Sequence, residues 1–252
     1  MKEINKGSFV SIIIPIFNDG SKIFPVISTL IFTIQREFEI IIVYDSEEDI
    51  TLNTLQYIKQ HNSNILLKHN EFGVGGINAV KTGINYAKYE YVMIWMSYHI
   101  DPEGKINDML NIMDKGADLV SANRFFSNLS HGRGKRFKNI ISKLGNLLFK
   151  IITHGILSDA TTSIKIFRTN KLKNIIKEQN SLTGWSIIAE WTIKFIINGY
   201  VVKQIDFHEN NLQFMYSKSN FKLKTQIKSY IACLFFAAKN RNKIRNKIRN
   251  NI

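Results

Sequence analysis

The hydrophobic positions of the first 100 residues fall into short continuous runs, which alternate with stretches where apolar residues recur at helical spacing. The continuous runs predict buried strands over residues 9–17, 38–44, 65–68 and 91–100, and the periodic stretches predict helices over 23–35, 49–62 and 77–88. Continuously apolar strands are typical of a parallel sheet that is covered on both faces. We therefore expect an α/β fold, with a doubly wound, mostly parallel sheet flanked by helices.

Two stretches of the second half, residues 137–152 and 226–239, combine lysines with apolar residues at helical spacing. Neither has the roughly 20 consecutive apolar residues that a membrane-spanning helix needs. Each could lie in a membrane interface with its lysines toward phosphate head groups, or pack on the domain as an ordinary amphipathic helix. The last residues, 239–252, repeat Asn-Lys-Ile-Arg and predict a mobile basic arm or a frayed helix.

The net charge of +14 is unevenly distributed along the chain. Residues 1–120 carry 10 Lys and Arg against 15 Asp and Glu, whereas residues 121–252 carry 24 against 5. Such a basic half predicts an anionic partner, which could be a membrane surface, a phosphorylated small molecule or nucleic acid. Nucleic acid is disfavoured, because basic and aromatic residues are not arranged as a stacking platform or a recognition helix.

Composition also predicts the compartment. The single cysteine, Cys233, excludes an intramolecular disulfide, and the N-terminal residues run into the first predicted strand without a long apolar segment or a cleavage site. We therefore expect a protein of the reducing cytoplasm.

Polar residues at the carboxyl ends of the predicted strands are the candidate ligand-binding residues, because open α/β sheets bind ligands there. Pro15 and Asn18 end the first strand, and Asp45 ends the second. Asp45 could accept hydrogen bonds from a base or ribose, although a carboxylate there also suits a helix N-terminus. Gly73 and Gly75 follow the third strand and precede a helix, where backbone N–H groups can approach an anion. Their spacing is not that of the dinucleotide fingerprint.

Together these stretches resemble glycosyltransferase family 2, the nucleotide-sugar-dependent transferases with a GT-A fold, and within it the polyprenyl-phosphate (dolichyl-phosphate) mannosyl- and glucosyltransferase-like branch. The resemblance spans residues 8 to 225. The matching stretches are 10–18, 39–45, 70–79, Asp101-Pro102, 116–120 with Arg124, 159–165, Glu190, and Gly199-Tyr200. The resemblance implies a GT-A-like domain over residues 1–225, with a nucleotide-binding half (1–120) and an acceptor half (121–225), followed by an amphipathic basic segment (226–252).

The resemblance also implies roles for individual residues. The residues implied to bind the nucleotide sugar are Pro15, Asn18, Asp45, Gly73, Gly75, Asn78, Lys81 and Ser97. Those implied on the acceptor side, or to bind a phosphate, are Arg124, Arg133, Lys135, Arg136, Lys138, Asp159, Lys165 and Glu190. A lysine- and arginine-rich loop is also compatible with a merely solvated surface.

The segment Trp95-Met96-Ser97 departs from the family pattern. Relatives carry an Asp-x-Asp motif here, whose carboxylates hold Mg²⁺ or Mn²⁺ against the donor diphosphate. If the strand stays extended, Ser97 and His99 point to one face with Asp101 close by, a set that suits Mn²⁺ better than Mg²⁺. The alternative is metal-independent transfer, in which Arg124 and the basic loop neutralise the diphosphate.

We therefore expect an inverting glycosyltransferase that moves a sugar from a UDP- or GDP-sugar to a polyprenyl phosphate or glycan precursor, peripheral on the inner face of the membrane. A lipid phosphate is already anionic and needs no strong base, whereas a sugar hydroxyl needs a carboxylate such as Asp101 or Asp159. The catalytic residues expected are Asp101, Asp159 and Arg124. The alternative is an inactive relative that binds a nucleotide sugar or a partner enzyme.

Overall fold

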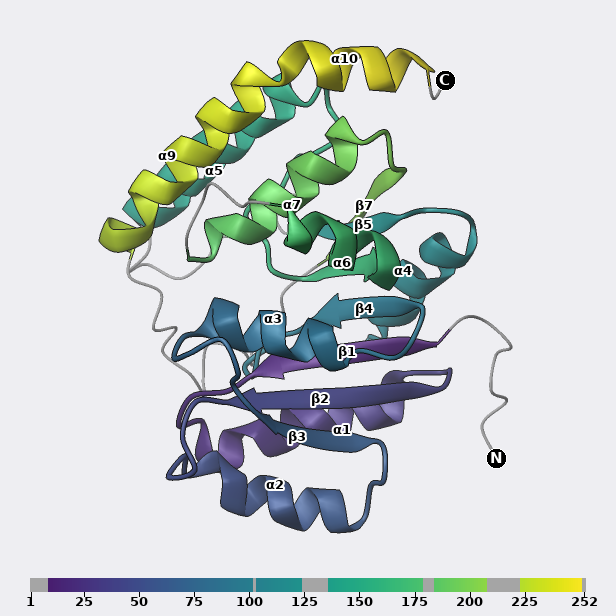
Figure 1. Cartoon of the computed structure of the whole chain (residues 1–252), viewed down its shortest axis with the longest axis vertical. Helices are drawn as coiled ribbons and strands as arrows, with labels where there is room; N and C mark the ends of the chain where they lie inside the picture. Colours follow the sequence, from purple (N-terminus) through teal and green to yellow (C-terminus); the bar gives the residue numbers. More distant parts are fainter. Residues whose placement is uncertain (1–8, 102, 124–135, 179–183, 208–222, 251–252) are drawn as a thin grey trace.

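One seven-stranded sheet organises the protein, and helices cover both of its faces (Figure 1). The computed structural model describes residues 9–101, 103–123, 136–178, 184–207 and 223–250. The strands are β1 (Val10–Pro15), β2 (Phe38–Tyr44), β3 (Ile65–His69), β4 (Tyr91–Ile94), β5 (Leu119–Asn123), β6 (Lys165–Arg168) and β7 (Val202–Asp206). Their order across the sheet is β3-β2-β1-β4-β6-β5-β7, and β6 is antiparallel to both its neighbours. The predicted doubly wound, mostly parallel α/β sheet is confirmed.

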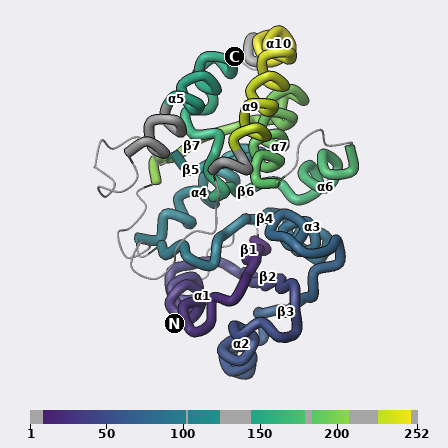
Figure 2. Tube along the Cα trace, turned by 90° about the vertical axis from the view of Figure 1, so that its left-hand side faces the viewer, coloured from purple at the N-terminus to yellow at the C-terminus, as the bar shows by residue number. Residues whose placement is uncertain are grey.

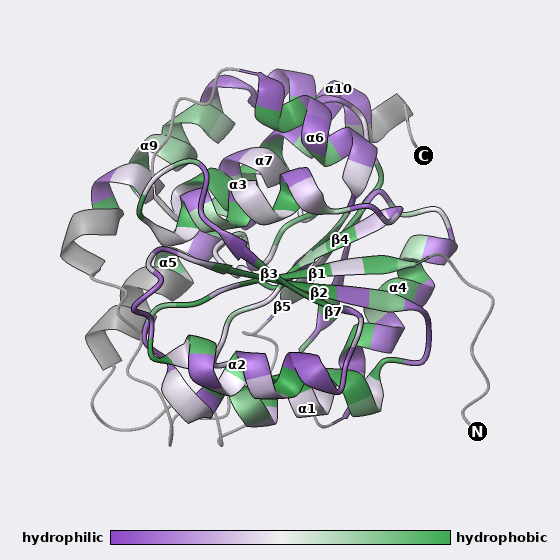
Figure 3. Ribbon diagram, turned by 60° about the horizontal axis from the view of Figure 1, so that its bottom comes forward, coloured by the Kyte–Doolittle hydropathy of each residue, from purple (hydrophilic) through white to green (hydrophobic). Residues whose placement is uncertain are grey.

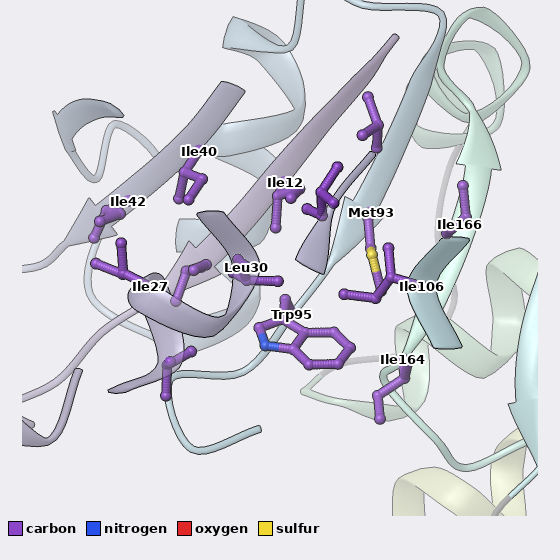
Figure 4. Close-up of a cluster of buried hydrophobic side chains, with 14 of the residues drawn as sticks. Ile12, Ile27, Leu30, Ile40, Ile42, Met93, Trp95, Ile106, Ile164 and Ile166 are labelled. Atoms are coloured by element: carbon purple, nitrogen blue, oxygen red, sulfur yellow. The ribbon is translucent and has the colours of Figure 1, made fainter. Parts of the chain in front are cut away.

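Alternating side chains of the strands divide the interior into two apolar layers. Ile12 and Ile14 of β1 point into one layer, while Ile13 points into the other. Part of the first layer is shown in Figure 4. This layer is closed by α1 (Ile23–Thr33), which follows the short 3₁₀ turn η1 (Gly20–Lys22), and by α2 (Thr51–Gln60) and α4 (Lys105–Asp114). The second is closed by α3 (Gly76–Tyr86), α6 (Thr169–Lys177) and α7 (Ser186–Ile197), on the opposite side of the sheet in Figure 3.

A third layer is formed by helices from the basic half of the chain: α5 (Arg136–Ile152), α9 (Leu223–Lys239) and α10 (Arg241–Asn250). α5 and α9 lie side by side in both Figure 1 and Figure 2, and α9 and α10 pack against α7. Ile244 of α10 is fully buried in this layer together with Cys233 and Ala237 of α9. Of the two alternatives expected for the C-terminus, a mobile basic arm or a frayed helix, the arm is wrong for residues 241–247, because they are helical and Ile244 anchors them. In the part of the chain that the structure describes, no helix is long and apolar enough to cross a bilayer.

The strand order places between β1 and β4 the position at which open α/β sheets have their ligand crevice. β1 pairs with β2 on one side and with β4 on the other. After β1 the chain adds β2 and β3 on one side of it, and after β3 it crosses back and adds β4 on the other side. This reversal is a topological switch point, where the loops after two neighbouring parallel strands diverge and leave room for a ligand. The carboxyl ends of β1 and β4 thus frame the candidate site.

Candidate functional site

The loop after β1 is held by the first turn of α2. Asn18 adopts a left-handed conformation with φ 52°, and its backbone N–H donates to Asp49 Oδ2 at 2.9 Å. The N–H groups of Asp19 and Gly20 both donate to Thr51 Oγ1, at 2.9 and 3.0 Å. The loop is therefore fixed by backbone contacts, which leave the Asn18 side chain exposed at the crevice.

Asp19 brings a carboxylate to the crevice, although the sequence reasoning did not select it as a site residue. Its carboxylate accepts the N–H of Phe17 at 3.2 Å, and the Ser97 side chain lies beside it. Burial is the main cause that raises the pKa of Asp19, and the Ser97 side chain and the Phe17 N–H oppose it. The Asp19–Ser97 contact thus joins the ends of β1 and β4 across the switch point.

The segment after β4 is a turn. β4 ends at Ile94, and the N–H of His99 donates to Met96 O at 3.0 Å, which closes a turn over residues 96–99. The prediction of a strand extending to residue 100 is therefore wrong. Because the chain turns, the strand alternation that would align Ser97 with His99 does not apply.

Asp101 caps a helix. Its two carboxylate oxygens accept the N–H groups of Lys105 at 2.9 Å and Ile106 at 2.8 Å, in the first turn of α4. The side chain is buried, and this burial raises the pKa of Asp101 against the opposing effect of the two N–H groups. The carboxylate is thus committed to the helix terminus.

His99 and Trp95 pack together below the crevice. Their rings meet edge to face at 5.4 Å between centroids, and Trp95 Nε1 donates to His99 O at 2.9 Å. Trp95 points into the first apolar layer, among the side chains shown in Figure 4. Ser97, His99 and Asp101 therefore have three different surroundings. Across the described residues, no group of three or more His, Cys, Asp or Glu is arranged to hold a metal ion.

The glycine loop after β3 is held by Asp45. Asp45 Oδ1 accepts from Asn70 Nδ2 at 2.7 Å, and Asp45 Oδ2 accepts the N–H of Gly75 at 2.9 Å. Asn70 Nδ2 also donates to Gly73 O at 2.8 Å, and Thr82 Oγ1 donates to Asn70 Oδ1 at 3.0 Å. Each oxygen of the half-buried Asp45 carboxylate retains a further lone pair toward the crevice. Asn70 is a second organiser of the site that the sequence reasoning did not single out.

The backbone of this loop requires glycine. Gly73 and Gly75 have φ of 84° and 131°, which disfavour any residue with a Cβ. At Gly76, where α3 begins, a Cβ would lie 2.7 Å from Trp185 Cζ2 at the start of α7. The indole ring thus packs against the start of α3. The other two donor-side candidates, Asn78 and Lys81, are half-buried on α3, while Pro15 is buried at the end of β1.

The loop that contains Asp159 is attached to α5. Asp159 Oδ1 accepts the N–H groups of Thr161 and Thr162, both at 3.2 Å, and Asn146 Nδ2 at 3.4 Å. Asn146 Oδ1 in turn accepts the N–H of Ala160 at 3.0 Å. Asp159 is fully buried, so its carboxylate shapes the loop from within.

The remaining acceptor-side candidates lie in the interior or outside the described residues. Lys165 Nζ donates to Ser121 Oγ at 2.8 Å, and Glu190 pairs with Lys194 Nζ at 3.3 Å; both Lys165 and Glu190 are fully buried. Arg124, Arg133 and Lys135 lie outside the described residues, and Arg136 and Lys138 belong to the first turn of α5.

Comparison with known proteins finds one matching family for this chain. The sequence profile of Glycosyl transferase family 2 matches residues 11–176. The chain is 24% identical to the poly(ribitol-phosphate) beta-N-acetylglucosaminyltransferase TarP of Staphylococcus aureus, with 96% of this chain and 68% of TarP covered. It is 22% identical to an undecaprenyl-phosphate 4-deoxy-4-formamido-L-arabinose transferase of Edwardsiella ictaluri, with 75% of this chain and 58% of that relative covered. The chain thus spans about three fifths to two thirds of the length of these relatives.

A solved structure has the same fold. Glucosyl-3-phosphoglycerate synthase of Mycobacterium tuberculosis, in complex with Mn²⁺, UDP and glucosyl-3-phosphoglycerate, superimposes with a TM-score of 0.66 at 15% identity. The match covers 94% of this chain and 82% of the synthase.

Proposed function

The chain belongs to glycosyltransferase family 2, and from this membership we propose that it transfers a sugar, with inversion, from a UDP- or GDP-sugar to a phosphate-bearing acceptor. The observation that carries the proposal is the set of polar groups at the carboxyl ends of the neighbouring strands β2, β1 and β4, with Asp45 holding the glycine loop and Asp19 beside Ser97. Glucosyl-3-phosphoglycerate synthase, which has the same fold, was solved with UDP and Mn²⁺ bound. TarP and the arabinose transferase are named for phosphate-bearing acceptors.

On the donor side, Asn18 and Asp45 would hold the base and ribose. Asp45 is suited to this because its carboxylate, already oriented by Asn70 and Gly75, can accept further hydrogen bonds from hydroxyl or N–H groups. The loop from Gly73 and the positive N-terminus of α3 would lie beside the phosphates, with Asn78 and Lys81 one turn further along.

The divalent cation found in the solved relatives does not fit the described residues of this chain. Asp101 is occupied by α4 and Asp45 holds the glycine loop, so the further carboxylate that the described residues of this site offer is Asp19, beside the Ser97 hydroxyl. A Mg²⁺ or Mn²⁺ ion bound with a diphosphate takes most of its oxygen ligands from phosphates and water and the rest from one or two protein carboxylates, and here the Asp19 carboxylate is already engaged by Ser97 and by the N–H of Phe17. We therefore propose that cationic side chains neutralise the leaving diphosphate, with Arg124, which directly follows β5, as the main candidate.

The acceptor would present an oxygen that is already anionic. Neither expected general base is suited to take a proton, because Asp101 caps α4 and Asp159 is enclosed by its own loop. A phosphate oxygen, such as that of a polyprenyl phosphate, can attack the anomeric carbon without a base. The undecaprenyl-phosphate transferase among the relatives supports this acceptor class.

Thermal unfolding with UDP- and GDP-sugars, each in EDTA, Mg²⁺ or Mn²⁺, tests the donor part of the proposal. We expect one nucleotide sugar to raise the Tm, and to do so in EDTA. Asp45→Ala should abolish the shift, whereas Glu48→Ala, which removes an exposed carboxylate three residues away, should keep it. No shift with any donor would overturn the proposal.

A second candidate function is a relative that binds a nucleotide sugar without turning it over, which is favoured by Trp95 and Ser97 standing where the family's Asp-x-Asp motif has its two carboxylates. Release of UDP or GDP from the bound donor, above the uncatalysed background and lost in Asp45→Ala, would exclude this candidate. Binding without release in the presence of polyprenyl phosphate would favour it over transfer.

A further inference from the structure

The outer side of the third layer exposes large apolar side chains in an ordered arrangement. On α5 these are Leu144, Leu147, Leu148 and Ile151, with exposed fractions of 41–58%. Their spacing follows one face of a helix. On the neighbouring α9, Ile231 and Phe235 lie one turn apart and are exposed by 46% and 72%. We call these six residues the apolar rows.

Both helices are nevertheless docked on the protein by their other faces. Phe149 of α5 and Cys233 and Ala237 of α9 are buried in the third layer. The apolar rows are thus a second apolar face on helices whose first face is already covered. Large apolar side chains exposed together on two neighbouring helices mark an interaction site.

The charge around the apolar rows is of one sign. α5, α9 and α10 contain no Asp or Glu, whereas they contain four, three and five Lys and Arg, respectively. Lys150 on α5, Lys228 and Lys239 on α9, and four basic residues of α10 have exposed side chains. Apolar side chains on helices surrounded by cations match the boundary between acyl chains and anionic head groups.

We propose that α5, α9 and α10 form a docking surface for an anionic lipid bilayer. A second copy of the chain fits less well, because two such surfaces would oppose cation to cation. Nucleic acid would match the cations and leave the apolar rows without a partner. The helices would lie in the plane of the membrane, with the apolar rows in the interface and the basic residues at the lipid phosphates.

The surface also connects to the candidate acceptor loop through α5. Asn146 lies on the buried face of α5, between Leu144 and Leu147, and binds the loop at Asp159 and Ala160. Docking would therefore bring this loop toward the head groups, where a lipid phosphate acceptor resides. This link rests on the proposed function, whereas bilayer binding itself does not.

Sedimentation of the full chain with vesicles tests the proposal. We expect binding to vesicles that contain phosphatidylglycerol, weaker binding at high salt, and little binding to phosphatidylcholine alone. The double variant Leu147→Ser, Phe235→Ser should lower the partition coefficient by about tenfold or more. Phe32→Ser is the matched control, because Phe32 is 73% exposed on α1, away from this layer, and should bind as the parent does.

Three results would overturn the proposal: no binding to anionic vesicles, equal loss of binding in Phe32→Ser, or equally strong binding to a soluble polyanion. Light scattering could give a fourth such result, namely that the parent is a dimer and the double variant a monomer. This result would identify the apolar rows as an interface between two copies of the chain. The nucleotide-sugar shift in Tm should persist in the double variant. This separates failure of docking from failure of the proposed function.

Discussion

The Asp19 carboxylate is half-buried at the crevice, and its burial makes it sensitive to pH. Its raised pKa means that the folded protein holds this proton more tightly than the unfolded chain. The corresponding stability is fully present below the ordinary pKa of 3.8 and is lost as pH rises through the raised pKa. At neutral pH the ionised group therefore opposes folding, as binding groups in native sites often do.

Asp19→Asn should be more stable than the parent near neutral pH, with the advantage shrinking as the pH falls toward the ordinary pKa. Urea unfolding at several pH values measures this difference. The amide can still accept the N–H of Phe17, so the loop is retained. A variant less stable than the parent at every pH would show that the carboxylate holds the loop together rather than straining it.

Ser97→Asp should create the metal dependence that the parent crevice lacks. The new carboxylate would face Asp19, so the two like charges should lower the Tm in EDTA, and Mn²⁺ should restore it. Thermal unfolding with and without the ion is the measurement, and Ser97→Ala is the control that adds no charge. If Mn²⁺ raised the Tm of the parent in the same way, Asp19 and Ser97 would already suffice to hold the ion, which would contradict the proposal.

Site residues were predictable from the sequence where their position depends only on where a strand ends. Asp45, Gly73 and Gly75 follow buried strands, so their approach to the crevice follows from the order of apolar runs. Asp19 and Asn70 were missed because their partners come from other strands, and a single sequence does not give those pairings. The donor-side roles of Asp45 and the glycine loop stay predictions.

At the level of elements, the close packing of α3 on β1 depends on Gly83. A Cβ at Gly83 would lie 2.4 Å from Ile13 Cγ2, whereas at Gly145 on α5 it would meet no described atom within 4 Å. Gly83→Ala should therefore lower the free energy of unfolding by about 1–3 kcal/mol. Gly145→Ala should raise it by about 0.5–1 kcal/mol through helix propensity. Equal effects of the two substitutions in urea unfolding would refute the overpacking argument.

The docking of α9 and α10 can be followed at Cys233, the single thiol of the chain. Burial raises its pKa to about 12, so the thiol should stay unreactive toward iodoacetamide until the layer opens. Ile244→Ala should lower the free energy of unfolding by about 2–5 kcal/mol and speed labelling. Lys243→Ala, at an exposed neighbour, should change neither. Rapid labelling of the parent would show that α9 is not held as described.

Element boundaries were predictable where composition changes sharply. β2 was predicted over its observed residues, because polar residues flank its apolar run on both sides. β4 was predicted six residues too long, since the residues of the turn at 96–99 include Tyr and Met, which also suit strands. The helix α10 was predicted as an arm or frayed helix because its buried contact, Ile244, is set by tertiary packing that the basic repeat does not reveal.

For the molecule as a whole, the doubly wound architecture was predictable because the hydrophobic positions of each strand and helix in the first half have a clear period. The position of β6 within the sheet was not predictable. Its four residues lie antiparallel between β4 and β5, although β5 precedes it in the chain. The two halves suggested by the sequence thus share one sheet, with β6 pairing across the boundary.

The position of β6 also sets the order in which the molecule can assemble during synthesis. As the nascent chain emerges, β1 to β4 can pair with strands that have already left the ribosome. β5 has no neighbour until β6 arrives, because its partners in the sheet are β6 and β7. Until then the edge of β4 stays unpaired, which is the state in which a chaperone would be needed. The carboxyl ends of β1 and β4 can thus come together before β5, β6 and β7 have paired.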